Sequence, residues 1–165
     1  MSAMTAMQNP SPETLFSPQR LSRYFADYGS FHETRGNRIC HYFGVTSILA
    51  TSLGLLSHLI VASGTLPAIN YRIDGATLAI LIVLFWYFIL DWRLALPFAF
   101  TLSGLYFLSR ALPLPWLWTL FVLGWIIQYV GHFAFEKKSP AFYKNLEHLL
   151  IGPLWIFAKT VRYIG

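Results

Sequence analysis

Histidines are the residues of this chain best suited to chemistry, and the five of them are His32, His41, His58, His132 and His148. Neutral imidazole is the commonest metal ligand in proteins. The single cysteine, Cys40, excludes an intrachain disulfide and thiolate motifs of the CxxC type. Ligation by histidine without thiolates suits iron, zinc, copper or nickel rather than calcium or magnesium.

The composition places these histidines in a membrane protein. The chain has 165 residues, of which 56% are hydrophobic and 12% are charged, whereas a soluble domain is about a quarter charged. Residues 39–135 contain five charged side chains, and the rest lie toward the two ends. This hydropathy excludes a nucleic-acid-binding module despite the net charge of +5, and the many aromatic residues exclude a disordered chain.

Four apolar stretches are candidates for the helices that position the histidines. A membrane span needs about 20 mostly apolar residues, and the four stretches cover 43–66, 75–90, 94–108 and 115–135. The second and third are short, so they are either tilted or form a tight helical hairpin that turns at 91–93. Spanning segments must be helical because lipid offers no partners to backbone polar groups.

A shorter apolar piece, 149–157, is interrupted by Gly152 and Pro153 and is too short to span. We interpret it as re-entrant or as lying in the membrane interface. The sequence therefore predicts an all-α fold, a polytopic membrane bundle of four transmembrane helices plus this C-terminal helix. We expect residues 1–18 to be a flexible tail and 19–165 to form one domain.

Basic residues flank the apolar region on both sides, which predicts that both termini are cytoplasmic in a bacterial inner membrane or in the endoplasmic reticulum. These basic residues are Arg20, Arg23, Arg35, Arg38, Lys137, Lys138, Lys144, Lys159 and Arg162. In this topology His32, His41, His132 and His148 all meet the cytoplasmic interface, while His58 lies toward the opposite face. We interpret His58 as a hydrogen-bonded residue without a part in the site.

The spacing of the polar residues adds a condition. His41 follows Asn37 by four residues, and Gln128, His132 and Glu136 are also four apart, so each set shares one helical face. His32 and His41 are nine apart, which puts them on opposite sides of a continuous helix. They converge only if the helix begins or breaks between them, and Gly36 is a plausible break.

Two alternatives stay open at this point. A histidine near a membrane interface is more often a hydrogen-bonded or snorkelling side chain than a ligand, and the run Glu136-Lys137-Lys138 is also typical of a solvated helix end. The chain would then be a non-enzymatic membrane scaffold or a transporter-like protein. A zinc-dependent hydrolase is disfavoured because neither HExxH nor GxSxG occurs.

Two sequence elements resemble a known family. FHETRGNRICH, residues 31–41, resembles the H-x4-N-x3-H element of the 2-hydroxy fatty acid dioxygenases. GWIIQYVGHFAFEKKSPAFYKNL, residues 124–146, resembles their second element, GW-x2-Q-x2-GH-x2-FEK-x2-PA-x3-NL. The second element is specific because it has many fixed letters at fixed spacing, and the similarity covers roughly residues 20–158.

The resemblance implies an integral membrane, Fe(II)-dependent dioxygenase. Such enzymes convert a 2-hydroxy fatty acid and dioxygen to the fatty acid one carbon shorter, a step of fatty acid α-oxidation. The expected partners are therefore the 2-hydroxy fatty acid, dioxygen and membrane lipid, with no nucleic acid. The sequence leaves the oligomeric state open.

The resemblance also implies site residues, and the motif positions are His32, Asn37, His41, Gln128, His132 and Glu136. The histidines are the expected iron ligands, and Asn37 and Gln128 are expected to orient ligands or substrate oxygen. His148 matches no motif position, so its candidacy as a ligand rests on topology alone. Either His148 or Glu136 would complete the ligand set.

Overall fold

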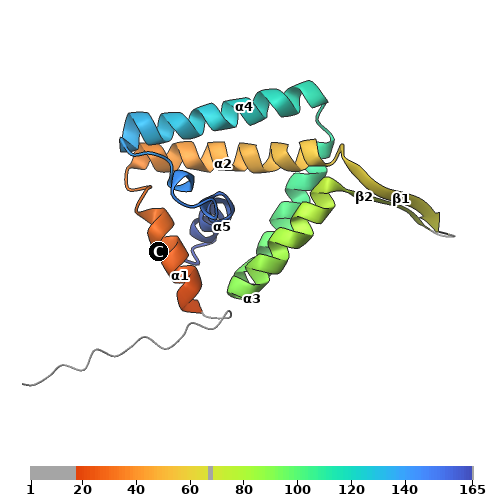
Figure 1. Ribbon diagram of the computed structural model, residues 1–165, viewed down its shortest axis with the longest axis horizontal. Coiled ribbons are helices and arrows are strands. Elements are labelled where there is room, and N and C mark those ends of the chain that lie inside the picture. Colours follow the sequence, from red (N-terminus) through yellow and green to blue (C-terminus); the bar gives the residue numbers. More distant parts are fainter. Residues whose placement is uncertain (1–17, 67–68, 165) are drawn as a thin grey trace, which may run out of the picture.

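A computed structural model of the chain describes residues 18–66 and 69–164 (Figure 1). The elements in chain order are α1 (Pro18–Gly29), α2 (Arg35–Leu56), β1 (Ile60–Leu66), β2 (Ile69–Asp74), α3 (Gly75–Arg110), α4 (Leu114–Val130), a π-helical turn (Gly131–Glu136), a 3-10 turn (Ala141–Tyr143) and α5 (His148–Thr160). The predicted tail lies outside the described residues except for Pro18, where α1 begins.

Three helices are long and apolar enough to cross a membrane, which agrees with the prediction of a membrane protein. They are α2, α3 and the continuous segment Leu114–Glu136 formed by α4 and the π-helical turn. The last of these matches the predicted stretch 115–135 closely. The four-span count is not confirmed, because the second and third predicted stretches form one element, α3.

α3 folds back on itself near its middle. Asp91 adopts an extended backbone inside the helix, with φ −163° and ψ 103°. The Tyr106 hydroxyl donates a hydrogen bond to Asp74, which lies 32 residues earlier, at 2.7 Å, whereas a straight helix would separate these residues by about 48 Å. The two halves are therefore antiparallel, and the predicted hairpin turn at 91–93 is confirmed. At about 24 and 28 Å, each half is shorter than the ~30 Å hydrocarbon core, so four crossings stay a prediction.

A two-stranded antiparallel sheet contradicts the expectation of a purely helical fold. α2 begins at Arg35, eight residues earlier than the predicted span, and ends at Leu56. The apolar residues that follow form β1, which pairs with β2 in the register Ser63↔Arg72 and projects away from the helices (Figure 1). The Arg72 guanidinium donates to the Ser57 carbonyl just after the end of α2, at 2.7 Å, and the strand that follows, IVASGTL, contains the β-branched residues Ile60, Val61 and Thr65, which favour strands.

The apolar core lies between α1, α3 and α5. Its buried members include Leu21, Phe25, Leu90, Leu94, Phe98, Ile151, Leu154 and Trp155. α5 covers the predicted C-terminal piece 149–157 and extends beyond it at both ends. The buried Tyr87 of α3 donates a hydrogen bond to the Leu150 carbonyl of α5 at 2.5 Å. The C-terminal helix is thus packed into the protein.

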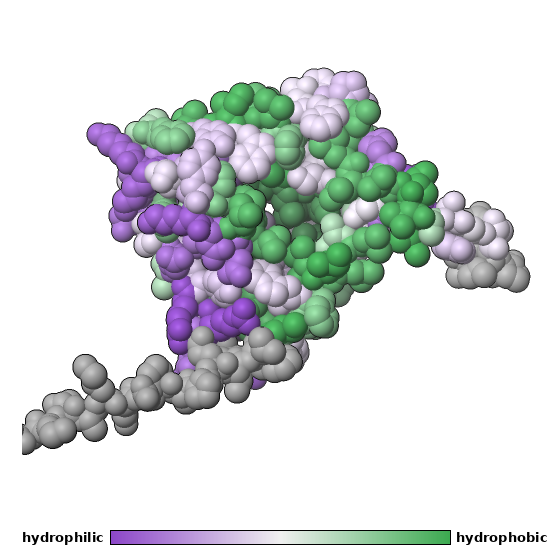
Figure 2. Space-filling model, in the orientation of Figure 1, coloured by the Kyte–Doolittle hydropathy of each residue, from purple (hydrophilic) through white to green (hydrophobic). Residues whose placement is uncertain are grey.

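α2 and α4 form the second layer and lie side by side in opposite directions (Figure 1). The Ser47 hydroxyl of α2 donates to the Leu120 carbonyl of α4 at 3.0 Å. This antiparallel pairing brings the beginning of α2 next to the end of α4. Hydrophilic residues gather over α1 and the neighbouring ends of these two helices (Figure 2), so the junction lies at the polar end of an otherwise apolar molecule.

Candidate metal centre

Three histidines from distant segments meet at this junction. His32, His41 and His132 each offer a ring nitrogen, and these atoms lie within 4.8 Å of one another. The ring centroids are 4.1 Å apart for His32 and His41 and 4.7 Å apart for His41 and His132. All three side chains are buried, with exposed fractions of 3%, 3% and 2%.

His32 reaches this cluster because the chain breaks between α1 and α2. α1 ends at Gly29, and Thr34 caps α2 by accepting a hydrogen bond from the Asn37 backbone N–H. The predicted break between His32 and His41 is therefore confirmed, but it lies in the connection before Gly36 and not at that glycine, which belongs to the first turn of α2.

Hydrogen bonds fix which nitrogen of two rings carries a proton. His32 Nδ1 donates to the Tyr28 carbonyl at 2.6 Å, and His41 Nδ1 donates to the Asn37 carbonyl at 3.1 Å. A carbonyl only accepts hydrogen bonds, so Nε2 of each ring keeps its lone pair. Burial lowers the pKa of His32 to about 4, which keeps this imidazole neutral near pH 7.

The unpaired ring nitrogens of the cluster fit a metal site. His32 Nε2 and His132 Nδ1 are buried and have no hydrogen-bond partner in the described part of the chain. A buried polar atom without a partner costs about 1–3 kcal/mol. Neutral imidazole nitrogens without thiolates suit iron, zinc, copper or nickel, so a transition metal bound here would remove this cost.

A π-helical turn carries His132 into the cluster. The turn spans Gly131–Glu136 and follows α4 directly, and such turns occur frequently at functional sites. Its first residue, Gly131, lies against the start of α2: a Cβ there would be 2.6 Å from Asn37 Oδ1 and 2.8 Å from Cys40 Cβ. Glycine at this position lets α4 approach α2 closely enough for His132 to meet His41.

We therefore expect Gly131→Ala to separate the two helices. The added methyl group should cost about 1–3 kcal/mol of stability, as overpacking in a tight core does, and should lower the metal content of the protein. Both effects are measurable as the midpoint of thermal unfolding in detergent and by elemental analysis. Gly104→Ala is the matched control, since a Cβ at Gly104 meets nothing within 4 Å; equal effects of both substitutions would contradict this role for Gly131.

His148 is not brought into the cluster, although the sequence analysis made it a candidate ligand. Its Nδ1 lies 3.0 Å from the Ala141 carbonyl oxygen, and its Nε2 lies 2.9 Å from a carboxylate oxygen of Asp27, both within hydrogen-bond distance. Both nitrogens are thus engaged, and neither is left to bind a metal. The ring holds α5 against α1.

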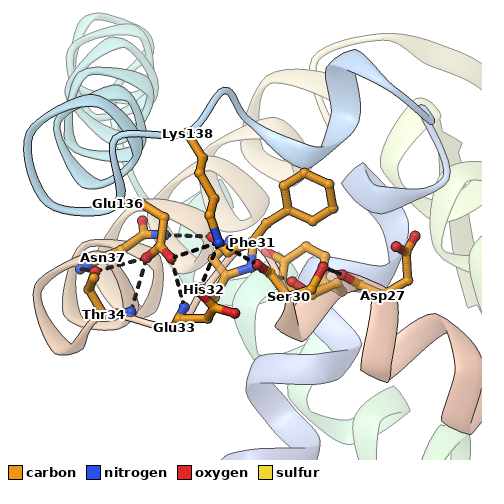
Figure 3. Close-up of polar contacts among 10 residues, drawn as sticks. Asp27, Ser30, Phe31, His32, Glu33, Thr34, Asn37, Glu136 and Lys138 are labelled. Atoms are coloured by element: carbon orange, nitrogen blue, oxygen red, sulfur yellow. Dashed lines mark hydrogen bonds and ion pairs between the residues drawn. The ribbon is translucent and has the colours of Figure 1, made fainter.

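Glu136, the other candidate for completing the ligand set, is engaged as well (Figure 3). Its carboxylate accepts hydrogen bonds from the backbone N–H groups of Glu33 and Thr34, each at 3.0 Å, from the Thr34 hydroxyl at 2.8 Å and from the Asn37 amide at 3.1 Å. Lys138 lies 3.9 Å from it. Glu136 therefore ties the end of the π-helical turn to the beginning of α2, and it stabilises the cluster from outside.

Asn37 connects this carboxylate to the histidines. Its side-chain amide donates to the Phe31 carbonyl at 2.9 Å as well as to Glu136. Its backbone carbonyl accepts a hydrogen bond from His41. Asn37 thus fixes both the connection that carries His32 and the orientation of the His41 ring. Outer partners of metal ligands commonly make contacts of this kind.

An apolar cavity of about 290 Å³ opens from the histidine cluster. It is lined by Tyr28, His32, His41, Val45, Ile48, Leu49, Ser52, Phe121, Trp125, Gln128, His132, Ala141, Phe142, His148, Leu149, Gly152 and Pro153. Along α2 the lining runs from His41 to Ser52, and along the π-helical turn and α4 from His132 to Phe121, a separation of eleven residues in each case. Eleven helical residues span about 16 Å, so the cavity suits an elongated molecule with one polar end.

Gln128 and Tyr28 add two polar groups near the histidines. Gln128 lines the cavity, and its amide makes no hydrogen bond to the described residues. Tyr28 also lines the cavity and stacks on His32, with centroids 4.2 Å apart. Tyr28 was not among the site residues predicted from the sequence, although its spacing of four residues before His32 indicates that the two side chains are neighbours.

Comparison with known proteins identifies the family of the chain. Residues 18–164 match the family described as 2-hydroxy-palmitic acid dioxygenase Mpo1-like. The curated protein 2-hydroxy-palmitic acid dioxygenase MPO1 of Saccharomyces cerevisiae is 26% identical over 151 residues, covering 84% of this chain and 78% of that protein. No solved structure matches the chain. Because the family match covers nearly the whole chain, this protein belongs to the Mpo1-like family.

Proposed function

We propose that this chain is an Fe(II)-dependent dioxygenase that shortens 2-hydroxy fatty acids by one carbon, with His32, His41 and His132 as the iron ligands. The observation that carries the proposal is the buried cluster of three histidines, with unpaired ring nitrogens, at one end of an apolar cavity. Family membership supports the same activity.

The iron would supply a centre that binds the carboxylate and the 2-hydroxyl of the substrate and activates dioxygen. The bond between C1 and C2 would break, so that the 2-hydroxy acid and dioxygen give the acid one carbon shorter, carbon dioxide from C1, and water. The protein supplies the positions. The carbonyls of Tyr28 and Asn37 hold two of the rings with Nε2 available, and Glu136 holds the turn that carries the third. Such outer contacts are worth 10–100-fold in metal affinity or activity.

The cavity would hold the acyl chain. Its wall between the histidines and Phe121 is mostly aliphatic and aromatic, and each CH₂ group transferred from water contributes about 0.8 kcal/mol. Apolar walls also exclude water from the reacting end. The amide of Gln128 faces the same space and would bind a substrate oxygen. His148 would serve as part of the wall, where its hydrogen bonds to Asp27 and Ala141 fix α5.

The substrate would reach the site from the surrounding lipid. We propose that both termini are cytoplasmic, which puts the polar end of the molecule, and with it the histidine cluster, at the cytoplasmic interface. A fatty acid in the cytoplasmic leaflet would have its headgroup at the depth of the iron and its tail among the apolar helices. The membrane would be a bacterial inner membrane or the endoplasmic reticulum.

The decisive experiment uses the full chain purified in detergent. Elemental analysis after anaerobic loading with Fe(II) should find about one iron per chain, and 2-hydroxypalmitate should yield pentadecanoate after air is admitted but not before. Palmitate, which lacks the hydroxyl, is the control substrate and should stay intact. Absence of iron binding and of dioxygen consumption would contradict the proposal and favour a non-enzymatic membrane scaffold.

Ser52 offers a test of the acyl-chain assignment, because it lines the end of the cavity farthest from the histidines. Ser52→Trp should fill that end and remove room for several CH₂ groups. Loss of two buried CH₂ groups is worth about tenfold in binding, so the ratio of kcat/KM for 2-hydroxypalmitate to that for 2-hydroxyoctanoate should fall by about tenfold or more.

Thr46→Trp is the matched control for this measurement. Thr46 lies on the same helix but lines an outer groove and not this cavity. It should leave the chain-length ratio unchanged. An unchanged ratio in Ser52→Trp would mean that the tail lies elsewhere.

A further inference from the structure

Tyr28 is a buried tyrosine whose side chain has no role in the proposed reaction as described so far. It lies in the last turn of α1 and is 4% exposed. Its ring stacks on His32, with centroids 4.2 Å apart and planes 17° apart, and lies 6.5 Å from the His41 ring and 6.0 Å from the His148 ring. Tyr28 therefore lies beside the histidine cluster, in the wall of the cavity.

The hydroxyl of Tyr28 has no hydrogen-bond partner among residues 18–66 and 69–164. The other buried tyrosine of the core, Tyr87, donates to the Leu150 carbonyl, as buried tyrosine hydroxyls usually do. The Tyr28 hydroxyl is not among the fully enclosed atoms without a partner, and Tyr28 lines the cavity, so its hydroxyl is open to the cavity. It is therefore available to donate a hydrogen bond to a ligand there.

Gly152 makes room for this hydroxyl. A Cβ at Gly152 would lie 2.8 Å from the Tyr28 hydroxyl oxygen and 3.2 Å from the carbon that carries it. Gly152 is a glycine inside helix α5, where glycine costs about 1 kcal/mol relative to alanine. Its missing side chain gives space to the tyrosine, and both residues line the same cavity. The hydroxyl is thus accommodated at the polar end of the cavity rather than in the packed core.

We propose that Tyr28 is a substrate-binding residue whose hydroxyl donates a hydrogen bond to the carboxylate of a 2-hydroxy acid bound in this cavity. The inference rests on the proposed function and adds the residue that recognises the acid group. A carboxylate is the strongest acceptor that such a substrate offers. The ring orients the hydroxyl because it is held by its stacking on His32.

The test compares Tyr28→Phe with the wild-type protein, both loaded with Fe(II) and kept anaerobic so that no turnover occurs. Binding of 2-hydroxypalmitate is followed by the fluorescence of the tryptophans near the cavity. Tyr28→Phe keeps the ring, so it should keep the iron, and it should weaken binding of 2-hydroxypalmitate about tenfold, as expected for a hydrogen bond to a charged group. Binding of 1,2-hexadecanediol, which lacks the carboxylate, should not change.

Gly152→Ala provides the second variant. In the wild-type background its methyl group should displace the hydroxyl and weaken 2-hydroxypalmitate binding, whereas in the Tyr28→Phe background it should have little further effect. Tyr24→Phe is the matched control, because Tyr24 lies one turn earlier in α1, packs on Trp86 and does not line the cavity. It should bind 2-hydroxypalmitate as the wild-type protein does.

The outcomes separate this inference from the proposed function. If the wild-type protein neither binds nor converts 2-hydroxypalmitate, the proposed function fails. If the wild-type protein does both and Tyr28→Phe binds it equally well, this inference alone is overturned. Loss of iron in Tyr28→Phe, or an equal loss of diol binding, would also overturn it, because either result would give Tyr28 a structural role in holding His32.

Discussion

Replacing His41 by alanine should abolish both iron binding and activity while the protein still inserts into the membrane. His41 is the member of the cluster that lies between the other two, with its ring 4.1 Å from His32 and 4.7 Å from His132. Substitution of residues that merely orient a ligand costs 10–100-fold, so removing the ligand itself should lower activity by more than about a hundredfold. Iron content should fall from about one per chain to near zero.

The helix that carries His41 should tolerate this change. His41 Nε2 makes no hydrogen bond to the described residues and Nδ1 makes one, to the Asn37 carbonyl. The structural loss is therefore small compared with the loss of a ligand. Yield in the membrane fraction and the helical circular dichroism signal should stay close to those of the wild-type protein, which separates loss of the site from loss of the fold.

Two other histidines supply controls for this experiment. His58 is exposed and lies outside the cluster, so His58→Ala should keep iron and activity. His148→Ala should keep iron, because both ring nitrogens of His148 bind protein groups, although loss of its link to Asp27 should loosen α5. Full iron content in His41→Ala would refute its assignment as a ligand, and loss of iron in His148→Ala would give that residue the ligand role instead.

The convergence of His32, His41 and His132 was predictable because it depends on large-scale features. Apolar stretches and basic flanks predict that the two ends of the hydrophobic region lie on one side of the membrane, and spacing alone indicates that His32 and His41 need a break between them. The structure provides this break between Gly29 and Arg35. The hairpin in α3 was foreseen as one of two alternatives because charged residues at 91–93 interrupt an apolar run.

Other features depend on partners that are distant in the sequence. Hydropathy counts the apolar residues after Leu56 in the same way whether they form helix or strand, so β1 was assigned to the first span. Topology placed His148 at the correct end of the molecule, but its nitrogens bind Asp27, 121 residues away, and Ala141. Glu136 was expected near the iron, and only the folded connection before α2 reveals that its carboxylate caps backbone groups.

Removing the Glu136 carboxylate should strongly destabilise the protein. Its side chain is 1% exposed, and it is the common acceptor for two backbone N–H groups, one hydroxyl and one amide. Glu136→Ala leaves the buried Asn37 amide and the partly buried groups of Glu33 and Thr34 without their acceptor, and breaking a buried charged network typically costs about 3–5 kcal/mol. The midpoint of thermal unfolding in detergent should fall sharply, and iron should be lost because the connection that carries His32 is released.

Glu136→Gln shows how much of this destabilisation comes from losing the charge and how much from losing the hydrogen bonds. The glutamine oxygen replaces the oxygen that accepts from Thr34 and Asn37, while its NH₂ group then faces the Glu33 N–H, which donates as well. One hydrogen bond and the charge are lost, so the destabilisation should be intermediate, about 1–3 kcal/mol.

Glu33→Gln is the matched control for both variants, since Glu33 shares Lys138 with Glu136 but is 66% exposed. An exposed ion pair contributes about 0–1 kcal/mol, so this variant should unfold close to the wild-type temperature and keep its iron. If Glu136→Ala also unfolded at that temperature, the network would not hold the cluster together. If Glu136→Ala kept its stability and lost only its iron, Glu136 would be a metal ligand and not the cap at the beginning of α2.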